Sequence, residues 1–211
     1  MKDTQGNIRY YGATPNNYID IGDTDSVGNP ILYRIIGVFD NKVKIIRNES
    51  IGLYSWDTSA SNVNSGCGIN EWSQADLMKL LNPGYESNSV GGSLWYNSGS
   101  GNCYNATNNS TTTCNFTSSG LSENVKSKIA DTLWNLGGGD YAGYANEMFN
   151  CEISNNVINS PSDGITRTTS WNGKIALMSP SDYGYAVDLT QCDKDLYSYN
   201  YGVCKNNNWL F

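Results

Sequence analysis

The chain has 211 residues, a formal net charge of −7, six cysteines and no histidine. This length fits one large domain, which can bury a core of its own, or two small ones. The negative charge argues against nucleic acid and anionic membrane as partners, because both attract clustered lysine and arginine. Without histidine the chain lacks the commonest general base and metal ligand, so its composition favours a binding module over an enzyme.

Uncharged polar residues are abundant, with 29 Asn and 22 Gly, and the chain also holds 15 Tyr. Asn and Gly adopt positive φ angles readily, so the sequence predicts many turns and long loops. The longest apolar runs, such as residues 35–39, are too short to span a membrane, so we expect no membrane insertion.

A β-hairpin is the first strong structural signal in chain order. Residues 1–30 are typical of an extended entry with turns. Two β-branched runs follow, over residues 32–39 and 43–47, and the residues between them are Asp, Asn and Lys. Short polar residues between two such runs are typical of a hairpin.

The first helix is expected over residues 70–81. Ser73 is placed to cap it, with Asp76 three residues later, and Pro83 would stop it. Residues 84–120 form an insertion rich in Gly, Ser, Asn and Thr, and a loop of that length is typically functional or mobile.

The second helix is the strongest helical signal in the chain. It is expected over residues 123–136, with Ser122 as its cap and three glycines after its end. Its apolar residues recur at helical spacing and would share one face: Val125, Ile129, Leu133 and Leu136.

The remainder of the chain is expected to be rich in loops. Residues 140–173 are typical of irregular structure with short strands, residues 174–179 of a strand, and Pro180 of the start of a helical turn. Residues 184–211 are again loop-like. The whole pattern predicts an α+β fold: a single loop-rich domain over residues 1–211, with small antiparallel sheets, two main helices and disulfide-stapled loops.

Six cysteines with uneven spacing predict disulfides and therefore an oxidising, extracellular compartment. Two pairs would each close a short loop, and the remaining cysteines would pair by elimination: Cys103 with Cys114, Cys192 with Cys204, and Cys67 with Cys151. Closing a loop of this size stabilises a protein by roughly 3 kcal/mol. Other pairings stay open, and the alternative is reduced, buried thiols in a cytosolic protein.

One acidic stretch is a weak candidate for a calcium site. Asp20, Asp23 and Asp25 lie on a Gly-containing segment, and clustered carboxylates can hold calcium through oxygen ligands. Val27, however, stands where an EF-hand loop would place its third oxygen ligand, and no suitably spaced Glu follows. A solvated acidic turn is the better interpretation, so we predict no metal and no cofactor.

Glycosidase chemistry would need two paired acids, one of them with a raised pKa. Four acids are candidates, and nothing in their spacing pairs any two of them: Glu71, Asp76, Glu147 and Asp182. We expect Asp76 to help its helix start and Asp182 to lie in the helical turn after Pro180.

Aromatic residues in the loops are the best candidates for a binding surface. Tyr and Trp flanked by Ser, Asn and Gly are typical of surfaces that recognise glycans or proteins. The candidates lie in loops beside the proposed disulfides: Trp95, Tyr96, Tyr197, Tyr199 and Tyr201. The alternative is that these rings cover a modest core, as we expect for Trp134 near the apolar helix face.

Short segments spread over nearly the whole chain carry a resemblance to a known family. They lie at residues 9–19, 34–38, 46–52, 55–57, 70–73, 80–85, 133–138, 171–174, 177–185 and 204–210. In order and spacing they resemble an uncharacterised domain of large surface proteins and pilin-like proteins from gut Firmicutes and their relatives. The resemblance implies a bacterial, exported, surface-attached protein, and it implies no particular activity.

This family is distantly similar to the C-type-lectin-like and formylglycine-generating-enzyme-like folds, which are loop-rich, two-helix α+β modules. No cysteine motif in this chain matches the catalytic residues of formylglycine-generating enzymes, so none is carried over. The family pattern continues past Trp209 and Leu210 with a closing strand, so the resemblance implies that the chain was cut short or has lost its tail at Phe211.

From these features we expect a non-catalytic domain on the outside of a bacterial cell, used for adhesion or ligand display. Its partner would be a host or cell-surface glycan or protein. One alternative is a structural domain of a pilus-like appendage, which would bind neighbouring subunits. A further alternative is a glycan-processing enzyme that uses two of the four acids above.

Overall fold

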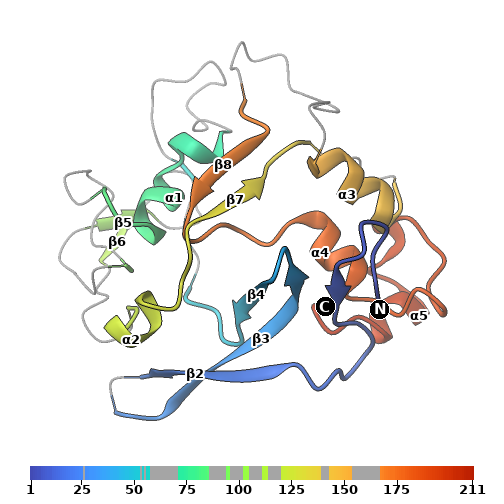
Figure 1. The fold of residues 1–211 in the computed structure, drawn as a ribbon, viewed down its shortest axis with the longest axis horizontal. Coiled ribbons are helices and arrows are strands. Elements are labelled where there is room, and N and C mark those ends of the chain that lie inside the picture. Colours follow the sequence, from blue (N-terminus) through green and yellow to red (C-terminus); the bar gives the residue numbers. More distant parts are fainter. Residues whose placement is uncertain are drawn as a thin grey trace.

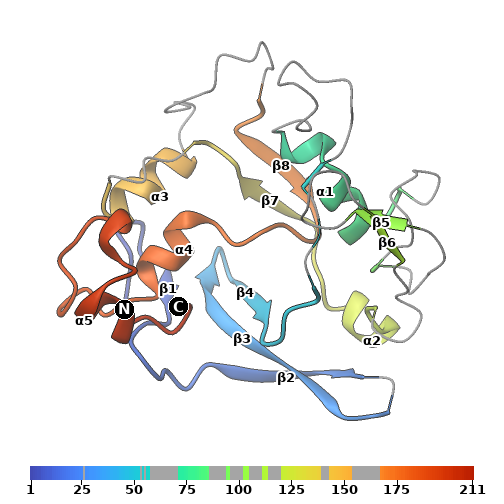
Figure 2. The same ribbon diagram turned by 180° about the vertical axis from the view of Figure 1, so that it is seen from behind.

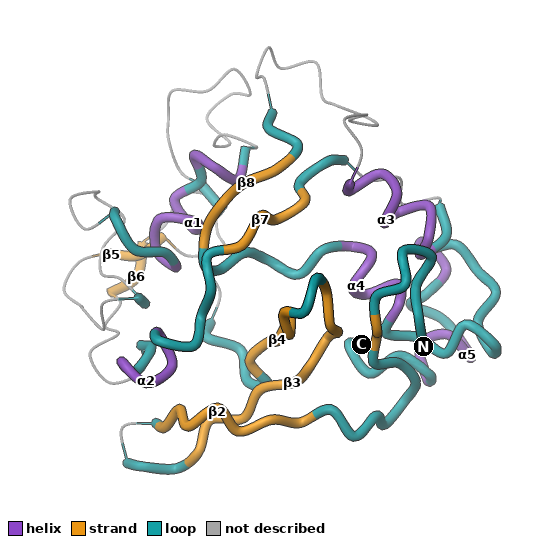
Figure 3. The backbone as a smooth tube through the Cα atoms, in the orientation of Figure 1, coloured by secondary structure: helices purple, strands orange, loops and turns teal. Residues whose placement is uncertain are grey.

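The computed structural model describes residues 1–25, 27–52, 54, 56–57, 71–85, 94–95, 102–104, 111–113, 120–138, 143–153 and 167–211. These residues form a mixed α+β fold with small antiparallel sheets, as predicted (Figures 1 and 3). The strands are β1 (Ile8–Arg9), β2 (Tyr18–Thr24), β3 (Pro30–Phe39), β4 (Lys42–Arg47), β5 (Asn102–Tyr104), β6 (Thr111–Thr113), β7 (Thr132–Asn135) and β8 (Ser170–Gly173).

The described residues hold five short α-helices where the sequence predicts two main ones. They are α1 (Asp76–Leu81), α2 (Glu123–Lys126), α3 (Ala145–Ile153), α4 (Pro180–Tyr185) and α5 (Gly202–Asn206). Two single 3-10 turns accompany them, η1 (Trp72–Gln74) and η2 (Leu196–Ser198). The helices in the described residues are therefore more numerous and shorter than the spacing of apolar residues predicts.

Strand β3 is the centre of the largest sheet. Its first half pairs with β2 and its second half with β1, while β4 pairs with its other edge, all antiparallel. The predicted hairpin is confirmed as β3 and β4. Its turn is formed by Asp40 and Asn41, whose φ angles of 46° and 61° are left-handed. Short polar residues accept that conformation more readily than others, which explains the turn at this position.

The first predicted helix exists but is shorter than expected and is capped differently. Ala75 has an extended backbone between η1 and α1, so the two do not form one helix. Ser73 does not cap α1; its N–H instead donates to the Glu71 side chain, which caps η1. Trp72 and Met78 are both buried, so burial of apolar side chains, rather than a side-chain cap, stabilises the helical structure of this segment.

The prediction of a helix over residues 123–136 is wrong beyond its first turn. Ser122 does cap α2, but the helix ends at Lys126. Residues 132–135 instead form β7, which pairs antiparallel with β8 and places Trp134 opposite Trp171. Exposure alternates along β7: Thr132 and Trp134 are partly buried, while Asn135 and Leu133 are exposed, Leu133 to 61%. Cross-strand pairing has therefore overridden the helical spacing.

The predictions for the C-terminal third are only partly right. Residues 174–179 are not a strand; the strand ends at Gly173. The helical turn at Pro180 is confirmed as α4, which Ser179 caps in a reciprocal arrangement with Asp182. Helix α3 lies in a region where we expected irregular structure and short strands.

The last residues of the chain close over the first ones. The Trp209 Nε1 donates to the Tyr10 carbonyl at 2.9 Å, and the Gly12 N–H donates to the Ala186 carbonyl at 3.0 Å. Asn208 forms bridges with both Gly12 and Val187. The two termini consequently lie at the same end of the molecule, near α4 and α5 (Figures 1 and 2).

Buried apolar side chains gather in two places. The first, which we call the α1 core, includes Trp72, Ala75, Met78, Trp95 and Val125. The second, which we call the C-terminal core, consists of small clusters around α3, α4 and the last residues: Ile36, Ala145, Phe149, Tyr185, Ala186, Val187, Cys192, Tyr199, Cys204 and Trp209. The candidate sites described below lie on the C-terminal core.

Candidate functional site

A buried arginine lies at the centre of a group of charged side chains. Arg9, on β1, is only 2% exposed. Its Nε donates to Asp3 Oδ2 and its Nη1 to Asp182 Oδ1, both at 2.8 Å. The guanidinium also lies over the rings of Phe39 and Tyr185, at 4.4 and 4.8 Å from their centroids. Two carboxylates and aromatic faces thus compensate the buried positive charge.

Asp182 has a second cationic partner. Its Oδ2 accepts from the Lys44 ammonium at 2.5 Å and from the Ser179 N–H at 2.9 Å. Burial by itself would raise the pKa of Asp182, but the charges of Lys44 and Arg9 and these hydrogen bonds outweigh it and hold the pKa below its usual range. Asp182 therefore joins β1, β4 and α4 through one carboxylate.

Glu152, on α3, adds another carboxylate beside this group. Its Oε1 accepts from the Ser181 N–H at 2.8 Å, and its Oε2 lies 2.6 Å from the Ser181 hydroxyl. Burial raises the pKa of Glu152, and the neighbouring Asp182 adds to that effect, while the Ser181 bonds and Lys44 oppose it. This contact ties α3 to α4.

We call Asp3, Arg9, Lys44, Glu152 and Asp182 the charged cluster. Sequence reasoning placed Asp182 after Pro180 but singled out none of the other four. Arg9 and Asp182 are 173 residues apart and Lys44 and Asp182 138 apart, and no local pattern marks such pairs. The only available signal was Ser179 three residues before Asp182, which marks the cap but not its ionic partners.

The structure does not bring the three candidate calcium ligands together. Asp23 is buried and accepts from the Tyr33 hydroxyl at 2.8 Å. Asp20 accepts from the Gly22 N–H, and Asp25 accepts from the backbone and side chain of Asn29. Within the described part of the chain, no group of three acidic or cysteine side chains is arranged to hold a metal.

The four candidate glycosidase acids are each engaged locally. Glu71 accepts from Ser73 and Thr168, Asp76 pairs with Lys79, and Glu147 accepts from the Tyr144 N–H. Asp182 belongs to the charged cluster. Each of these carboxylates thus has a hydrogen-bonding or ionic partner that explains its position without a catalytic role.

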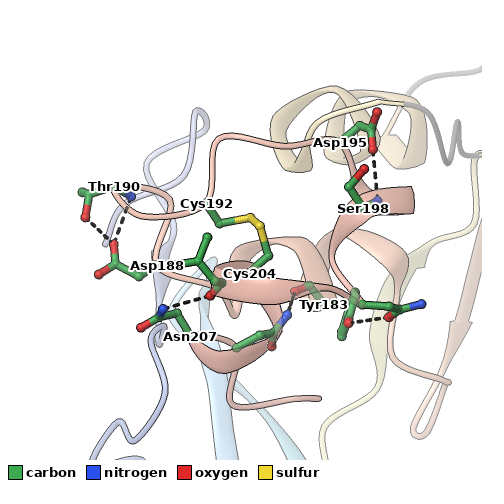
Figure 4. Close-up of a disulfide and its surroundings, with 11 residues drawn as sticks. Tyr183, Asp188, Thr190, Cys192, Asp195, Ser198, Cys204 and Asn207 are labelled. Carbon is green, nitrogen blue, oxygen red and sulfur yellow. Dashed lines mark hydrogen bonds between the residues drawn. A yellow bond between two sulfur atoms is a disulfide. The ribbon is translucent and has the colours of Figure 1, made fainter.

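A disulfide joins Cys192 and Cys204, as predicted, with an S–S distance of 2.02 Å (Figure 4). Both cysteines are buried against Val187 and Tyr199. The segment between them contains η2 and the start of α5 and is fixed by further contacts. Asp195 accepts from the Ser198 N–H, and the Tyr183 hydroxyl donates to Asn200. We call residues 192–204 the disulfide segment.

Of the aromatic residues predicted to form a binding surface, two are exposed and two are buried. Tyr197 and Tyr201, on the disulfide segment, are 68% and 70% exposed. Tyr199 is fully buried, because its ring packs on Tyr183 at 5.9 Å beneath the segment. Trp95 is buried in the α1 core. Neither can contact a ligand from the surface, and Tyr96 lies outside the described residues.

The other expected disulfides fall partly outside the described residues. Cys103 lies in β5, which pairs with β6, but Cys114 is not among the residues described. Cys151 lies in α3, half-buried, and Cys67 is likewise not described. The pairs Cys103 with Cys114 and Cys67 with Cys151 therefore stay predictions.

Comparison with protein-family models, with curated proteins and with solved structures found no match to this chain. Across the residues that the structure describes, no helix is both long enough and apolar enough to cross a membrane.

Proposed function

We propose that this chain is a non-catalytic domain on a bacterial cell surface that binds a ligand, for adhesion or display, through the disulfide segment. The partner would be a glycan or protein of a host or of a cell surface. The observation that carries the proposal is the exposure of Tyr197 and Tyr201 on a segment whose two ends are joined by a disulfide.

The geometry of the disulfide segment suits recognition. A tyrosine ring supplies a large contact area and a hydroxyl while losing little side-chain entropy when it binds. The disulfide, the Asp195 cap and the Tyr183 to Asn200 bond fix the backbone that carries both rings. A fixed backbone lowers the cost of ordering on binding, so a small contact area can still give useful affinity.

The disulfide also supports an extracellular location. Disulfides persist in oxidising compartments and are rare in the cytosol of most organisms. The resemblance to surface-protein and pilin-like domains favours the same location and a bacterial source. The absence of histidine and the local engagement of the candidate acids favour binding over catalysis.

The test is a binding screen with matched variants. The wild-type protein would be applied to a glycan array and to host-cell surface proteins, and any hit quantified. The double variant Tyr197→Ala/Tyr201→Ala should bind about tenfold more weakly or worse, because exposed aromatic anchors carry much of a typical interface energy.

The control is Tyr11→Ala, which removes a 40% exposed tyrosine outside the disulfide segment and should leave binding unchanged. Binding that survives the double variant would reject the disulfide segment as the site. Regular filaments of the purified protein with no ligand bound would instead support the pilus-like alternative.

A further inference from the structure

Arg34, on β3, is a half-buried cation that has aromatic neighbours and no acidic partner among the described residues. Its guanidinium lies between two rings, 4.5 Å from the centre of the Tyr18 ring and 4.3 Å from that of Trp209. Aromatic faces attract a guanidinium through the ring quadrupole, but they carry no opposite charge. The positive charge of Arg34 is therefore held in place without being neutralised.

One buried side chain fixes the orientation of this guanidinium. Asn17 is 1% exposed, and its Oδ1 accepts from Arg34 Nε at 3.0 Å and from Arg34 Nη2 at 2.8 Å. The Asn17 Nδ2 donates to the Ile35 carbonyl at 2.8 Å, which holds the amide in this position. Arg34 Nη1 has no hydrogen-bond partner among the described residues, and it is not shielded from water. The edge formed by Nη1 and Nη2 thus offers two parallel N–H donors to a ligand.

The two rings beside Arg34 differ in exposure. Trp209 is buried, and its Nε1 donates to the Tyr10 carbonyl, so this ring is a fixed inner wall. Tyr18 lies opposite Arg34 in the β2–β3 ladder and is 53% exposed. Its hydroxyl has no hydrogen-bond partner within the part of the chain that the structure describes. A ligand that reaches the free edge of Arg34 can therefore also contact the ring and the hydroxyl of Tyr18.

We propose that Arg34, Tyr18 and Trp209 form a binding site for the carboxylate of an acidic sugar, of the hexuronic acid class. The two carboxylate oxygens accept from the two free donors of Arg34, a pairing that gives strong and directional hydrogen bonds. The C–H face of the sugar ring lies on Tyr18, which presents an apolar face beside a polar hydroxyl. The site includes no residue of the disulfide segment, so it adds a second contact surface to the domain.

The physical cost of binding favours an acidic sugar over an acidic peptide. An aspartate or glutamate side chain carries its carboxylate on a flexible chain, which loses freedom when it binds, whereas a hexuronic acid carries it directly on a rigid ring. The net charge of −7 repels anions at long range. The site must therefore select its ligand by direct contact rather than by attraction from a distance.

A matched pair of sugars tests the proposal. The purified chain would be titrated with glucuronate and, separately, with glucose, which lacks the carboxylate, while NMR follows the Arg34 Nε–H and Trp209 Nε1–H signals. Glucuronate should shift both signals with a Kd of roughly 1 mM, a value typical of so small a ligand, and glucose should shift neither. No shift with glucuronate at about 20 mM would overturn the proposal, as would an equal response to glucose.

A third probe, glutamate blocked at both ends, distinguishes a peptide ligand from a sugar. It should bind about tenfold more weakly than glucuronate or worse, because it lacks the ring that lies on Tyr18. Blocked glutamate that binds as tightly as glucuronate would overturn the assignment to a sugar. These signals come from Arg34 and Trp209 rather than from Tyr197 and Tyr201, so the result does not depend on whether the disulfide segment binds a ligand.

Variants separate the geometry of Arg34 from its charge. Arg34→Met should weaken glucuronate binding about tenfold or more, because hydrogen bonds between charged groups are lost. Lys42→Met is the matched control, since it removes one exposed positive charge from the neighbouring strand β4 and should leave binding unchanged. Equal losses in these two variants would overturn the proposal.

Tyr18 supplies a test that does not alter the guanidinium. Tyr18→Ala should weaken glucuronate binding about threefold or more, whereas Tyr18→Phe keeps the ring and should lose less. Because Tyr18 is largely exposed, these variants still decide should Arg34→Met fail to fold. Binding that is unchanged in Tyr18→Ala would remove the sugar ring from Tyr18 and overturn the proposed site.

Discussion

The α1 core and the C-terminal core contrast in what they bury. In the α1 core the completely buried side chains are apolar, among them Ala75, Met78 and Val125. Around the C-terminal core the buried residues include Arg9, Glu152 and Asp182, none more than 5% exposed. Glu71 and Asn82 are also buried beside the α1 core, but their partners there are backbone groups and hydroxyls, whereas the C-terminal core encloses charges that pair with each other.

The contrast teaches what each kind of core specifies. Apolar side chains gain free energy from burial in many arrangements, so they favour a compact state without defining its details. A buried charge stabilises only when its partners are at hydrogen-bonding distance, so the charged cluster fixes how β1, β4, α3 and α4 meet. Removing one member of the charged cluster should therefore lower the free energy of unfolding by more than the intact cluster contributes per residue, because the remaining charges stay buried without their partner.

The largest expected effect comes from Arg9→Met. The variant leaves Asp3 and Asp182 buried with less compensation, and breaking a buried ion pair typically costs about 3–5 kcal/mol. Unfolding in denaturant, followed by fluorescence of the six tryptophans, would measure the loss. Asp131→Asn is the matched control, because its carboxylate is 74% exposed and such pairs contribute at most about 1 kcal/mol. Equal losses for the two variants would contradict the contrast.

Met78→Ala tests the apolar side of the comparison. Met78 is completely buried in the α1 core, and truncating such a side chain costs about 2–5 kcal/mol through lost burial and the cavity left behind. Met78→Leu keeps the volume and should cost less than about 1.5 kcal/mol. The loss in Met78→Ala should stay constant between pH 5 and 8, because no charge is uncovered; a strong pH dependence would show that the two cores are coupled.

The smallest effect is the pH dependence contributed by Glu152. Burial raises its pKa in the folded state, so its contribution to stability is fully present below the unfolded pKa and is lost as the pH rises through the folded value. Glu152→Gln should flatten that loss.

Asp3 contributes a pH dependence of stability with the opposite sign. Burial alone would raise its pKa, but hydrogen bonds from Asn7 and Arg9 and the charge of Arg9 lower it. Its contribution is present above the unfolded pKa and disappears as the pH falls through the folded one. Unfolding measured at several pH values separates the two, and an unchanged slope in Glu152→Gln would contradict the prediction.

Local signals predicted local structure well. The β3–β4 turn needs only two consecutive residues with left-handed φ angles, and Asp40 and Asn41 provide them. The helical turn at Pro180 needs only a proline near its start, and α4 begins at that residue. Such features depend on neighbours in the chain, so composition and spacing suffice to find them.

Several of the failures involve partners that are distant in the sequence. Residues 132–135 have helical apolar spacing, but β8, some 35 residues later, pairs with them and makes them a strand. Tyr199 resembles its neighbours Tyr197 and Tyr201, but it is buried because it packs with Val187, the disulfide and the ring of Tyr183. The charged cluster could not be predicted at all, because nothing near Arg9 or Lys44 in the sequence identifies Asp182.

The contacts between residues 10–12 and residues 186–209 also bear on the order in which the protein folds. Tyr10 is paired with Ile36 of β3, whereas its contact with Trp209 spans 199 residues, and Gly12 is held by Ala186 and Asn208, which are nearly as distant in the sequence. The contacts of Tyr10 and Gly12 with the C-terminal core therefore close very long loops and should form late in folding, while the pairing of β1 with β3 closes only a short one. We expect a Trp209→Ala variant to expose residues 10–12 to protease while residues 8–9 stay protected by β3.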